Sequence, residues 1–159
     1  MKKTSLHALA ATLLGGVSSV LLADEIPLSQ CPEPVRETIR GNTGLGRIDE
    51  IKTIRMENRV LYLAEIDLPG KRERKLHIAG DGALLKMIEE IRPGDLPRKV
   101  KSTMDTFLAP GGRFDSADRV TAGGKVEYHV DLDLADDVDL HLVIDENGGI
   151  LRRREEADF

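Results

Sequence analysis

The chain has 159 residues, with 23 Lys and Arg against 28 Asp and Glu, and a formal net charge of −5 at pH 7. An acidic chain is repelled by phosphates, and two tyrosines, three phenylalanines and no tryptophan leave few rings to stack on bases. Nucleic acid is therefore not an expected partner.

The first 23 residues have the features of a secretory signal peptide. Lys2 and Lys3 precede an uncharged run from Leu6 to Leu22, and Ala23 is a small residue at the expected cleavage point. An uncleaved membrane anchor is the alternative, but glycines and serines dilute the run below a typical span of about twenty apolar residues. We expect a bacterial periplasmic or secreted protein that is free of the membrane after cleavage.

Export leaves Cys31, the single cysteine, without an intramolecular partner. Free cysteine commonly behaves as a small apolar side chain, so we expect Cys31 to be buried at the start of a helix. The alternative is a reactive thiol, which would need a histidine beside it as a base.

Helices are expected shortly after the leader and again near residue 96. In the first, Pro32 or Pro34 suits the initial turn, and Val35 and Ile39 lie on one face. In the second, Asp95 is the expected N-cap, and a single apolar stripe contains Leu96, Val100, Met104 and Phe107. Glycine-rich segments end both helices.

Four strands are expected after each helix. Clean alternation of apolar and polar residues predicts strands at 60–68 and 126–134. Further strands are expected before and after them, at 47–56 and 72–79 and again at 113–121 and 138–145. Glycine-containing hairpin turns at 80–82 and 147–149 predict the last strands, 83–90 and 150–156. The order of one helix followed by a four-stranded antiparallel meander, twice, predicts an α+β fold.

The stretch Val60–Glu90 occurs again as Val126–Glu156, at a constant distance of 66 residues. Ten residues of the first stretch are identical to the residue 66 positions further along: Val60, Tyr62, Asp67, Leu68, Leu76, Ile78, Gly82, Leu85, Glu89 and Glu90. A register held without gaps predicts one unit made twice. We expect a signal peptide at 1–23, one repeat at 24–91 and a second at 92–159. Repeats of about 65 residues are marginal alone, so they should share a sheet or a core.

Core and turn residues in both halves carry a resemblance to a known family. In the second half they are Leu96, Pro97, Val100, Val126, Tyr128, Val130, Leu142, Ile144, Gly148 and Leu151. In the first half they are Pro32, Val35, Val60, Tyr62, Leu76, Ile78, Gly82 and Leu85, with Cys31 in place of the usual Leu. In these residues the sequence resembles the PepSY-like family of exported bacterial proteins. The family is also similar to tandem-repeat β-lactamase inhibitor proteins, whose two halves form one concave sheet. The resemblance implies non-catalytic protein binding, with peptidase inhibition by some members.

Motifs of known catalytic machinery are missing from the sequence. There is no GxSxG, no GxxxxGK[ST] and no HExxH. Three histidines on expected strands, His77, His129 and His141, are the partners that a catalytic Cys31 would need, and no local signature supports that pairing. We therefore predict no enzyme, no catalytic residue, no cofactor and no dedicated metal site.

Candidate binding residues lie on the outward side of the expected strands. In the second repeat they are Glu127, His129, Asp131, Asp133, Asp139 and His141, and in the first they are Leu61, Leu63, Glu65 and His77. A three-residue loop at 135–137 would set Asp133 opposite Asp139, and like charges in that position need compensation by a cation or a basic group.

Two functions remain open at this point. The favoured one is an exported protein-binding module whose partner is another envelope or secreted protein, with inhibition of an enzyme such as a peptidase as its sharper form. The alternative is a periplasmic sensor that binds a cation or small ligand on the acidic outward face of the second repeat.

Overall fold

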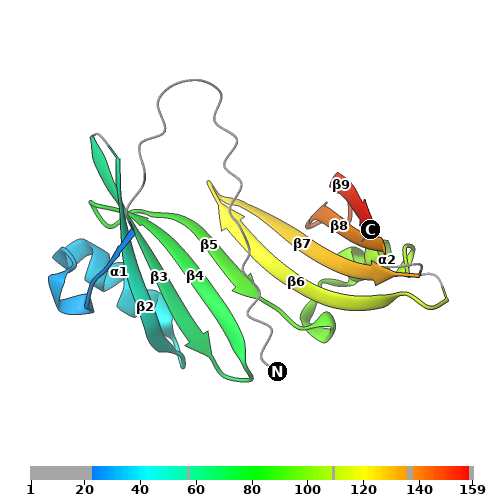
Figure 1. Ribbon diagram of the computed structural model, residues 1–159, viewed down its shortest axis with the longest axis horizontal. Helices are drawn as coiled ribbons and strands as arrows, with labels where there is room; N and C mark the ends of the chain where they lie inside the picture. The colour runs from blue at the N-terminus through cyan, green and yellow to red at the C-terminus, as the bar shows by residue number, and fades with distance from the viewer. Residues whose placement is uncertain (1–22, 57, 109, 136–137, 158–159) are drawn as a thin grey trace.

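The structure, a computed structural model, describes residues 23–56, 58–108, 110–135 and 138–157 (Figure 1). Within these residues, nine strands form a single antiparallel sheet in which each strand pairs with the next one along the chain. The strands are β1 (Ala23–Glu25), β2 (Arg47–Met56), β3 (Arg59–Leu68), β4 (Arg72–Ala79), β5 (Leu84–Glu90), β6 (Arg113–Ala122), β7 (Lys125–Leu134), β8 (Val138–Asp145) and β9 (Ile150–Ala157). The helices are α1 (Glu33–Thr43) and α2 (Arg98–Asp105), preceded by short 3₁₀ turns at Leu28–Gln30 and Pro93–Asp95.

The expected α+β fold of two helix-plus-meander repeats is wrong, because the protein is mainly β. The helices have only 11 and 8 residues, whereas β5 pairs directly with β6 and makes the sheet continuous from end to end. The β5–β6 register runs from Lys86 opposite Ala122 to Glu90 opposite Asp118. The short strand β1, which the sequence did not predict, adds an edge beside β2.

The individual strands begin and end within one residue of the expected positions. The alternation along β7 is the reason: Tyr128, Val130 and Leu132 are buried, while His129 and Asp131 between them are half-buried. The expected loop after β7 also gives the correct register, since Asp133 lies opposite Asp139 and Asp131 lies opposite His141.

Both helices begin one residue after a proline. Pro32 precedes α1 and Pro97 precedes α2, and neither side chain at those ends caps a backbone N–H group. The expectation that Asp95 is the N-cap of α2 is therefore wrong, because Asp95 ends the preceding 3₁₀ turn. Each helix buries two side chains of its apolar stripe, which confirms that these stripes face a core.

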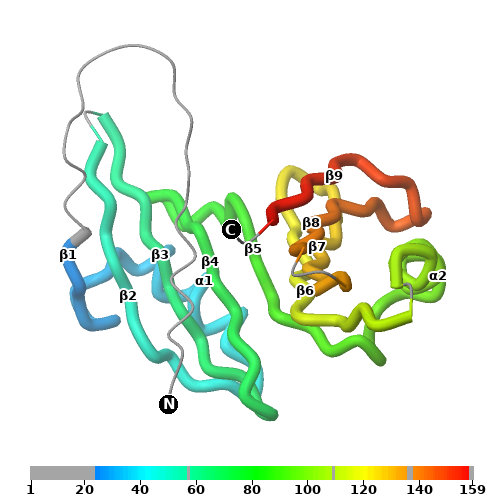
Figure 2. Tube along the Cα trace, turned by 45° about the vertical axis from the view of Figure 1, so that its right-hand side comes forward, coloured from blue at the N-terminus to red at the C-terminus, as the bar shows by residue number. Residues whose placement is uncertain are grey.

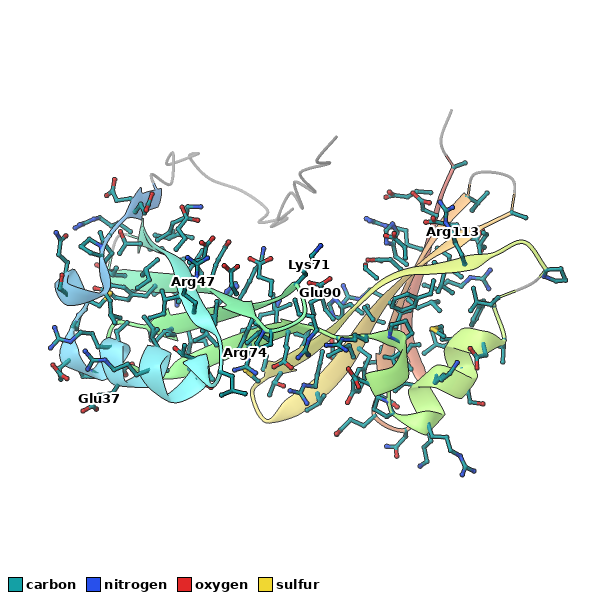
Figure 3. The ribbon with its side chains drawn as sticks, turned by 90° about the horizontal axis from the view of Figure 1, so that it is seen from below. Glu37, Arg47, Lys71, Arg74, Glu90 and Arg113 are labelled. Atoms are coloured by element: carbon teal, nitrogen blue, oxygen red, sulfur yellow. The ribbon has the colours of Figure 1, made fainter. Side chains whose placement is uncertain are left out.

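Two hydrophobic cores lie on the same face of the sheet, one under each helix (Figures 1 and 3). The α1 core contains Cys31, Val35, Ile39, Ile51, Ala64, Ile66, Leu68, Leu76 and Ile78. The α2 core contains Ile91, Leu96, Val100, Met104, Ala117, Tyr128, Val130, Leu132, Leu140, Leu142 and Ile144. Residues directly opposite each other in neighbouring strands share a face. Such pairs connect the two cores: Glu89 on β5 lies opposite Arg74 on β4 and Arg119 on β6, and Arg119 lies opposite Tyr128 on β7. The two cores therefore share a face.

The parts of the sheet on either side of the β5–β6 pairing are inclined to each other, as Figure 2 shows. Between the two cores lies a polar cluster, the Glu89 cluster, which consists of Glu89, Arg72, Arg74 and Arg119. The Glu89 side chain is 9% exposed, and its carboxylate accepts hydrogen bonds from Arg74 and Arg119 and forms an ion pair with Arg72 at 3.6 Å.

The hairpin turns that lead into β5 and β9 are held against the helices in the same way. Thr38 Oγ1 in α1 donates a hydrogen bond to the carbonyl of Gly82 over 2.6 Å, and Thr103 Oγ1 in α2 donates to the carbonyl of Gly148 over 2.7 Å. Both glycines have positive φ, 89° and 85°, a conformation that L side chains rarely adopt. These turns fix how closely each helix approaches the sheet.

The expected signal peptide lies outside the described residues, apart from Ala23, which pairs with Ile54 in β1–β2. None of the helices in the described parts of the chain is long and apolar enough to cross a membrane.

Candidate binding face of the sheet

The face of the sheet opposite the helices is called the outer face here. Its members follow from the pairing register, because cross-strand partners share a face and successive residues alternate. They include Lys52 and Ile54 of β2, Leu61, Leu63, Glu65 and Asp67 of β3, Glu73, Lys75 and His77 of β4, and Lys86 and Ile88 of β5. Further along they include Asp118 and Val120 of β6, Glu127, His129, Asp131 and Asp133 of β7, Asp139, His141 and Val143 of β8, and Arg152, Arg154 and Glu156 of β9. Figure 3 shows the side chains on both sides of the sheet, with Arg47 and Arg113 on the outer side and Arg74 on the helix side.

The end of the outer face formed by β2 to β4, called the apolar end here, contains a small apolar patch of Ile54, Leu61 and Leu63 among charged side chains. Leu61 lies opposite Ile54, and Leu63 lies between Lys52 on β2 and His77 on β4. These side chains are half-buried although no helix covers them. Burial lowers the pKa of His77, and the positive charges of Lys86 and Lys75 lower it further, so His77 is neutral at pH 7.

A charged row borders this apolar area. Lys75 Nζ lies 3.8 Å from a carboxylate oxygen of Glu65 and 3.5 Å from one of Glu73. Burial and a hydrogen bond with Glu65 raise the pKa of Glu73, although Lys75 opposes that shift. Two carboxyl groups therefore share one ammonium group beside Leu63.

The acidic residues of β7 and β8 are paired within the protein itself. Asp131 accepts hydrogen bonds from Ser116 Oγ over 2.8 Å and shares a hydrogen bond with His141 Nδ1 over 2.6 Å. Asp133 accepts from Arg113 Nε over 2.6 Å, and Asp133 in turn raises the pKa of Arg113. The repulsion between Asp133 and Asp139 is thus compensated by an arginine from β6.

A bound cation is therefore not needed to balance the charges of the acidic residues on β7 and β8. Within the described residues, no group of three or more His, Cys, Asp or Glu side chains could hold a metal ion. Asp145, at the end of β8, accepts hydrogen bonds from the backbone N–H groups of Asn147 and Gly149 and is committed to its turn.

The predicted binding residues do not form one compact site. Leu61, Leu63, Glu65 and His77 lie on β3 and β4, whereas the remaining candidates lie on β7 and β8. Three strand spacings, roughly 14 Å, separate β4 from β7. The candidates therefore mark two ends of one broad face, the apolar end and the charged end.

The charged end is hollowed. A cavity of about 390 Å³ is lined by Asp118, His129, Asp131, His141, Leu142, Val143, Arg152, Arg153 and Arg154. Sequence reasoning missed the arginines because β9 has three consecutive arginines and no alternation of polar and apolar residues. Pairing of β9 with the predicted strand β8 would have found them, since Arg152 and Arg154 lie opposite Val143 and His141.

A second cavity of about 380 Å³ lies at the opposite edge of the sheet. Its lining residues are Glu25, Ile26, Pro27, Leu28, Ile48, Asp49, Glu50 and Ile51. It adjoins the irregularity in β2 between Ile48 and Glu50, where the β2–β3 register shifts by one residue.

Cys31 lies in the α1 core, as expected from its position before the helix. It is 3% exposed, and burial raises the pKa of its thiol, so the sulfur is protonated and shielded from solvent. This location suits an apolar packing role.

The fold that this geometry defines is shared with solved structures of proteins from Bacteroides. The structure is similar to a BLIP-like protein from Bacteroides fragilis, with a TM-score of 0.59 at 14% identity over 81% of this chain and 89% of that chain. It is equally similar to DUF2874 family proteins from Bacteroides uniformis (TM-score 0.60, 16% identity, 79% and 89% covered) and Bacteroides ovatus (TM-score 0.59, 12% identity, 79% and 88% covered). At such low identity the likeness is one of fold.

The sequence by itself matches no family model, and a comparison with curated proteins also gives no match.

Proposed function

We propose that this protein is a non-catalytic protein-binding module of the bacterial envelope, and that it binds its partner through the outer face. The observation that carries the proposal is the outer face itself, a sheet surface that no helix of the described residues covers, with an apolar end and a hollowed, charged end. A broad, open surface of this kind suits another protein better than a small molecule, which binds in enclosed apolar pockets.

The size of the outer face is sufficient for a stable complex. Nine strands at about 4.8 Å spacing span roughly 38 Å, and eight residues of strand extend about 26 Å. The product, roughly 1,000 Å², exceeds the approximately 800 Å² that each partner contributes to a standard interface.

The similarity of fold supports an inhibitory form of this proposal. One of the similar structures is described as BLIP-like, and inhibition of an envelope or extracellular enzyme, such as a peptidase, is the corresponding function for this chain. The PepSY-like resemblance of the sequence and its leader-like first 23 residues support the same class and a periplasmic or secreted location.

The alternative function, a cation-binding sensor, is disfavoured by the charges of the outer face. Asp131 is already hydrogen-bonded to His141 and Asp133 is paired with Arg113, and a divalent cation would have to displace these partners.

The test is capture of a partner by crosslinking in the cell envelope, with the double variant Leu61→Asp/Leu63→Asp compared with wild type. We expect the variant to lose the crosslinked partner, because two carboxylates would be introduced into the apolar end of the interface. The matched control is Leu45→Asp/Leu84→Asp, which makes the same chemical change at exposed leucines away from the outer face.

A partner that crosslinks equally to wild type and to Leu61→Asp/Leu63→Asp would contradict the use of this face, provided that thermal melts show both proteins folded. When the captured partner is an enzyme, its reaction rate with and without an equimolar amount of this protein tests the inhibitory form directly.

A further inference from the structure

The hollow at the charged end is open on the outer face and is built by four successive strands, β6 to β9. Its volume of about 390 Å³ falls at the lower end of the range for ligand pockets, so it can receive one side chain or a small polar group. The available hydrogen-bonding groups in its wall decide which kind of group fits.

The carboxylates of the hollow are already engaged. Both oxygens of Asp131 are used, one by Ser116 and the other by His141. Asp118 also has an interaction partner in the protein. A basic group entering the hollow would therefore compete with existing contacts for every carboxylate that lines it.

The arginines of the hollow differ in whether their guanidinium groups already have a partner in the protein. Arg154 Nη2 lies 3.0 Å from Glu156, and Arg153 pairs with Glu155 and lies over the ring of Phe107. Arg152, by contrast, makes no hydrogen bond or ion pair with any residue in the described part of the chain. It is an exposed, uncompensated guanidinium group at the mouth of the hollow.

A second polar group at the same place lacks a hydrogen-bond partner among the described residues. The Nε2 atom of His129 is buried without a hydrogen-bond partner, since Glu127 Oε2 at 3.7 Å is beyond hydrogen-bonding distance. Buried polar atoms are normally satisfied by protein, water or a bound group, so this atom marks an incomplete polar environment beside the hollow.

We propose that the hollow receives an acidic side chain, Asp or Glu, of the partner protein, and that Arg152 is the residue that binds its carboxylate. A guanidinium group matches a carboxylate through two parallel hydrogen bonds, which gives both strength and orientation. Because the hollow opens on the outer face, this inference rests on the proposed function. It reverses the expectation that the acidic residues of β7 and β8 attract a cation or a basic partner.

The experiment is a titration of the purified protein with three blocked tripeptides, acetyl-Gly-Glu-Gly-amide, acetyl-Gly-Gln-Gly-amide and acetyl-Gly-Lys-Gly-amide. The side-chain NMR signals of His129 and His141 report on the hollow, and His77 at the apolar end of the face is an internal control. We expect saturable shifts of His129 and His141 with the Glu peptide at millimolar concentration, and none with the other two.

Arg152→Gln should weaken binding of the Glu peptide at least tenfold, because a hydrogen bond to a charged group is lost. The matched control is Arg98→Gln, which removes the same charge from an exposed residue at the start of α2. Shifts of equal size with the Lys peptide, no shift with the Glu peptide up to about 50 mM, or unchanged binding by Arg152→Gln would overturn the proposal.

The result is separable from the test of the proposed function. A partner that is lost with Leu61→Asp/Leu63→Asp but retained with Arg152→Gln would support the binding face and refute the acidic anchor. Binding of the Glu peptide that depends on Arg152, without any captured partner, would support the hollow as a carboxylate site and count against the binding module.

Discussion

Arg74 on β4 and Glu89 on β5 face each other across the sheet, and Arg74 donates two hydrogen bonds to one oxygen of Glu89, from Nε over 2.9 Å and from Nη2 over 2.5 Å. Arg74 also donates to the backbone carbonyl of Asn42 near the end of α1. The pair therefore ties the end of a helix to the middle of the sheet, where Arg119 on β6 approaches the same carboxylate.

Replacing Glu89 should test this arrangement. Glu89→Gln leaves three guanidinium groups around a neutral amide in a buried position, and removal of one member of a buried ion pair costs about 3 kcal/mol of unfolding free energy. Chemical denaturation measures the change.

The control is Glu155→Gln, at the residue 66 positions further along, whose side chain is 48% exposed on β9. We expect a change within about 0.5 kcal/mol there. An equal effect of the two substitutions would mean that the Glu89 cluster contributes no more than a surface pair.

Tyr128 provides a test of the α2 core. It is 6% exposed among Val130, Leu142 and Ile144, and burial raises the pKa of its hydroxyl. Tyr128→Ala should lower the unfolding free energy by about 3 kcal/mol, as expected for truncation of a buried aromatic side chain. Glu127→Ala on the outer face is the neighbouring control, and a melting temperature lowered more by the control than by Tyr128→Ala would contradict the packing.

The lowered pKa of His77 leads to a prediction of how stability depends on pH. Its folded-state pKa is lowered by burial and by Lys86 and Lys75, so the unfolded chain binds a proton more readily than the folded protein. Below the unfolded pKa of about 6.5 the unfolded state therefore gains stability, and this contribution to folding falls as the pH drops from about 7.5 to about 5.5.

The measurement is the melting temperature at those two pH values for wild type and for His77→Gln. We expect a smaller fall on acidification in the variant, because the proton that favours the unfolded state has no site there. An identical fall in both proteins would show that His77 is protonated equally well in the folded and unfolded chain.

A side chain at Gly82, in the turn before β5, is expected to clash with Pro34. A Cβ atom at this position would lie 2.6 Å from Pro34 Cβ and 2.8 Å from the backbone carbonyl of Pro34, and the φ of 89° disfavours any L side chain. Gly82→Ala should cost about 3 kcal/mol of unfolding free energy, from strain together with the clash. Gly94→Ala, where nothing lies within 4 Å of the added atom, should be nearly neutral in the same denaturation series.

Strand positions were predictable from the sequence where a strand has one buried side, as β7 does. Tyr128, Val130 and Leu132 alternate with polar residues, and the three-residue loop after Leu134 set the correct register of Asp133 against Asp139. The fold class was not predictable in the same way. The decisive pairing of β5 with β6 sets Lys86, Glu89 and Glu90 against Ala122, Arg119 and Asp118, and only the pair Ile88 and Val120 is apolar on both strands. A single pair of this kind gives no apolar pattern from which the pairing could be predicted.

The candidate site was predicted only in part for a related reason. The alternation of apolar and polar residues and the expected hairpin register identified His129, Asp131 and His141 as outward-facing. Their side-chain partners, such as Ser116, and the arginine that pairs with Asp133, Arg113, come from β6, and the sequence did not predict these contacts. Strand β9 is exposed along its entire length, so hydrophobic alternation could not reveal that Arg152 and Arg154 line the hollow.

The strand order of the sheet has a consequence for how the protein reaches this structure. Every strand pairs with the strand that follows it in the chain, so each pairing closes through a single turn or the short segment that contains a helix. Contacts of such short sequence separation form quickly, because little chain entropy is lost on closing each loop. The contacts between each helix and its hairpin turn span more of the chain. The hydrogen bond from Thr38 to Gly82 joins residues 44 positions apart, and that from Thr103 to Gly148 joins residues 45 positions apart. A chain that emerges N-terminus first during synthesis can therefore extend its sheet hairpin by hairpin, while each helix docks only after the hairpin turn that receives it has emerged.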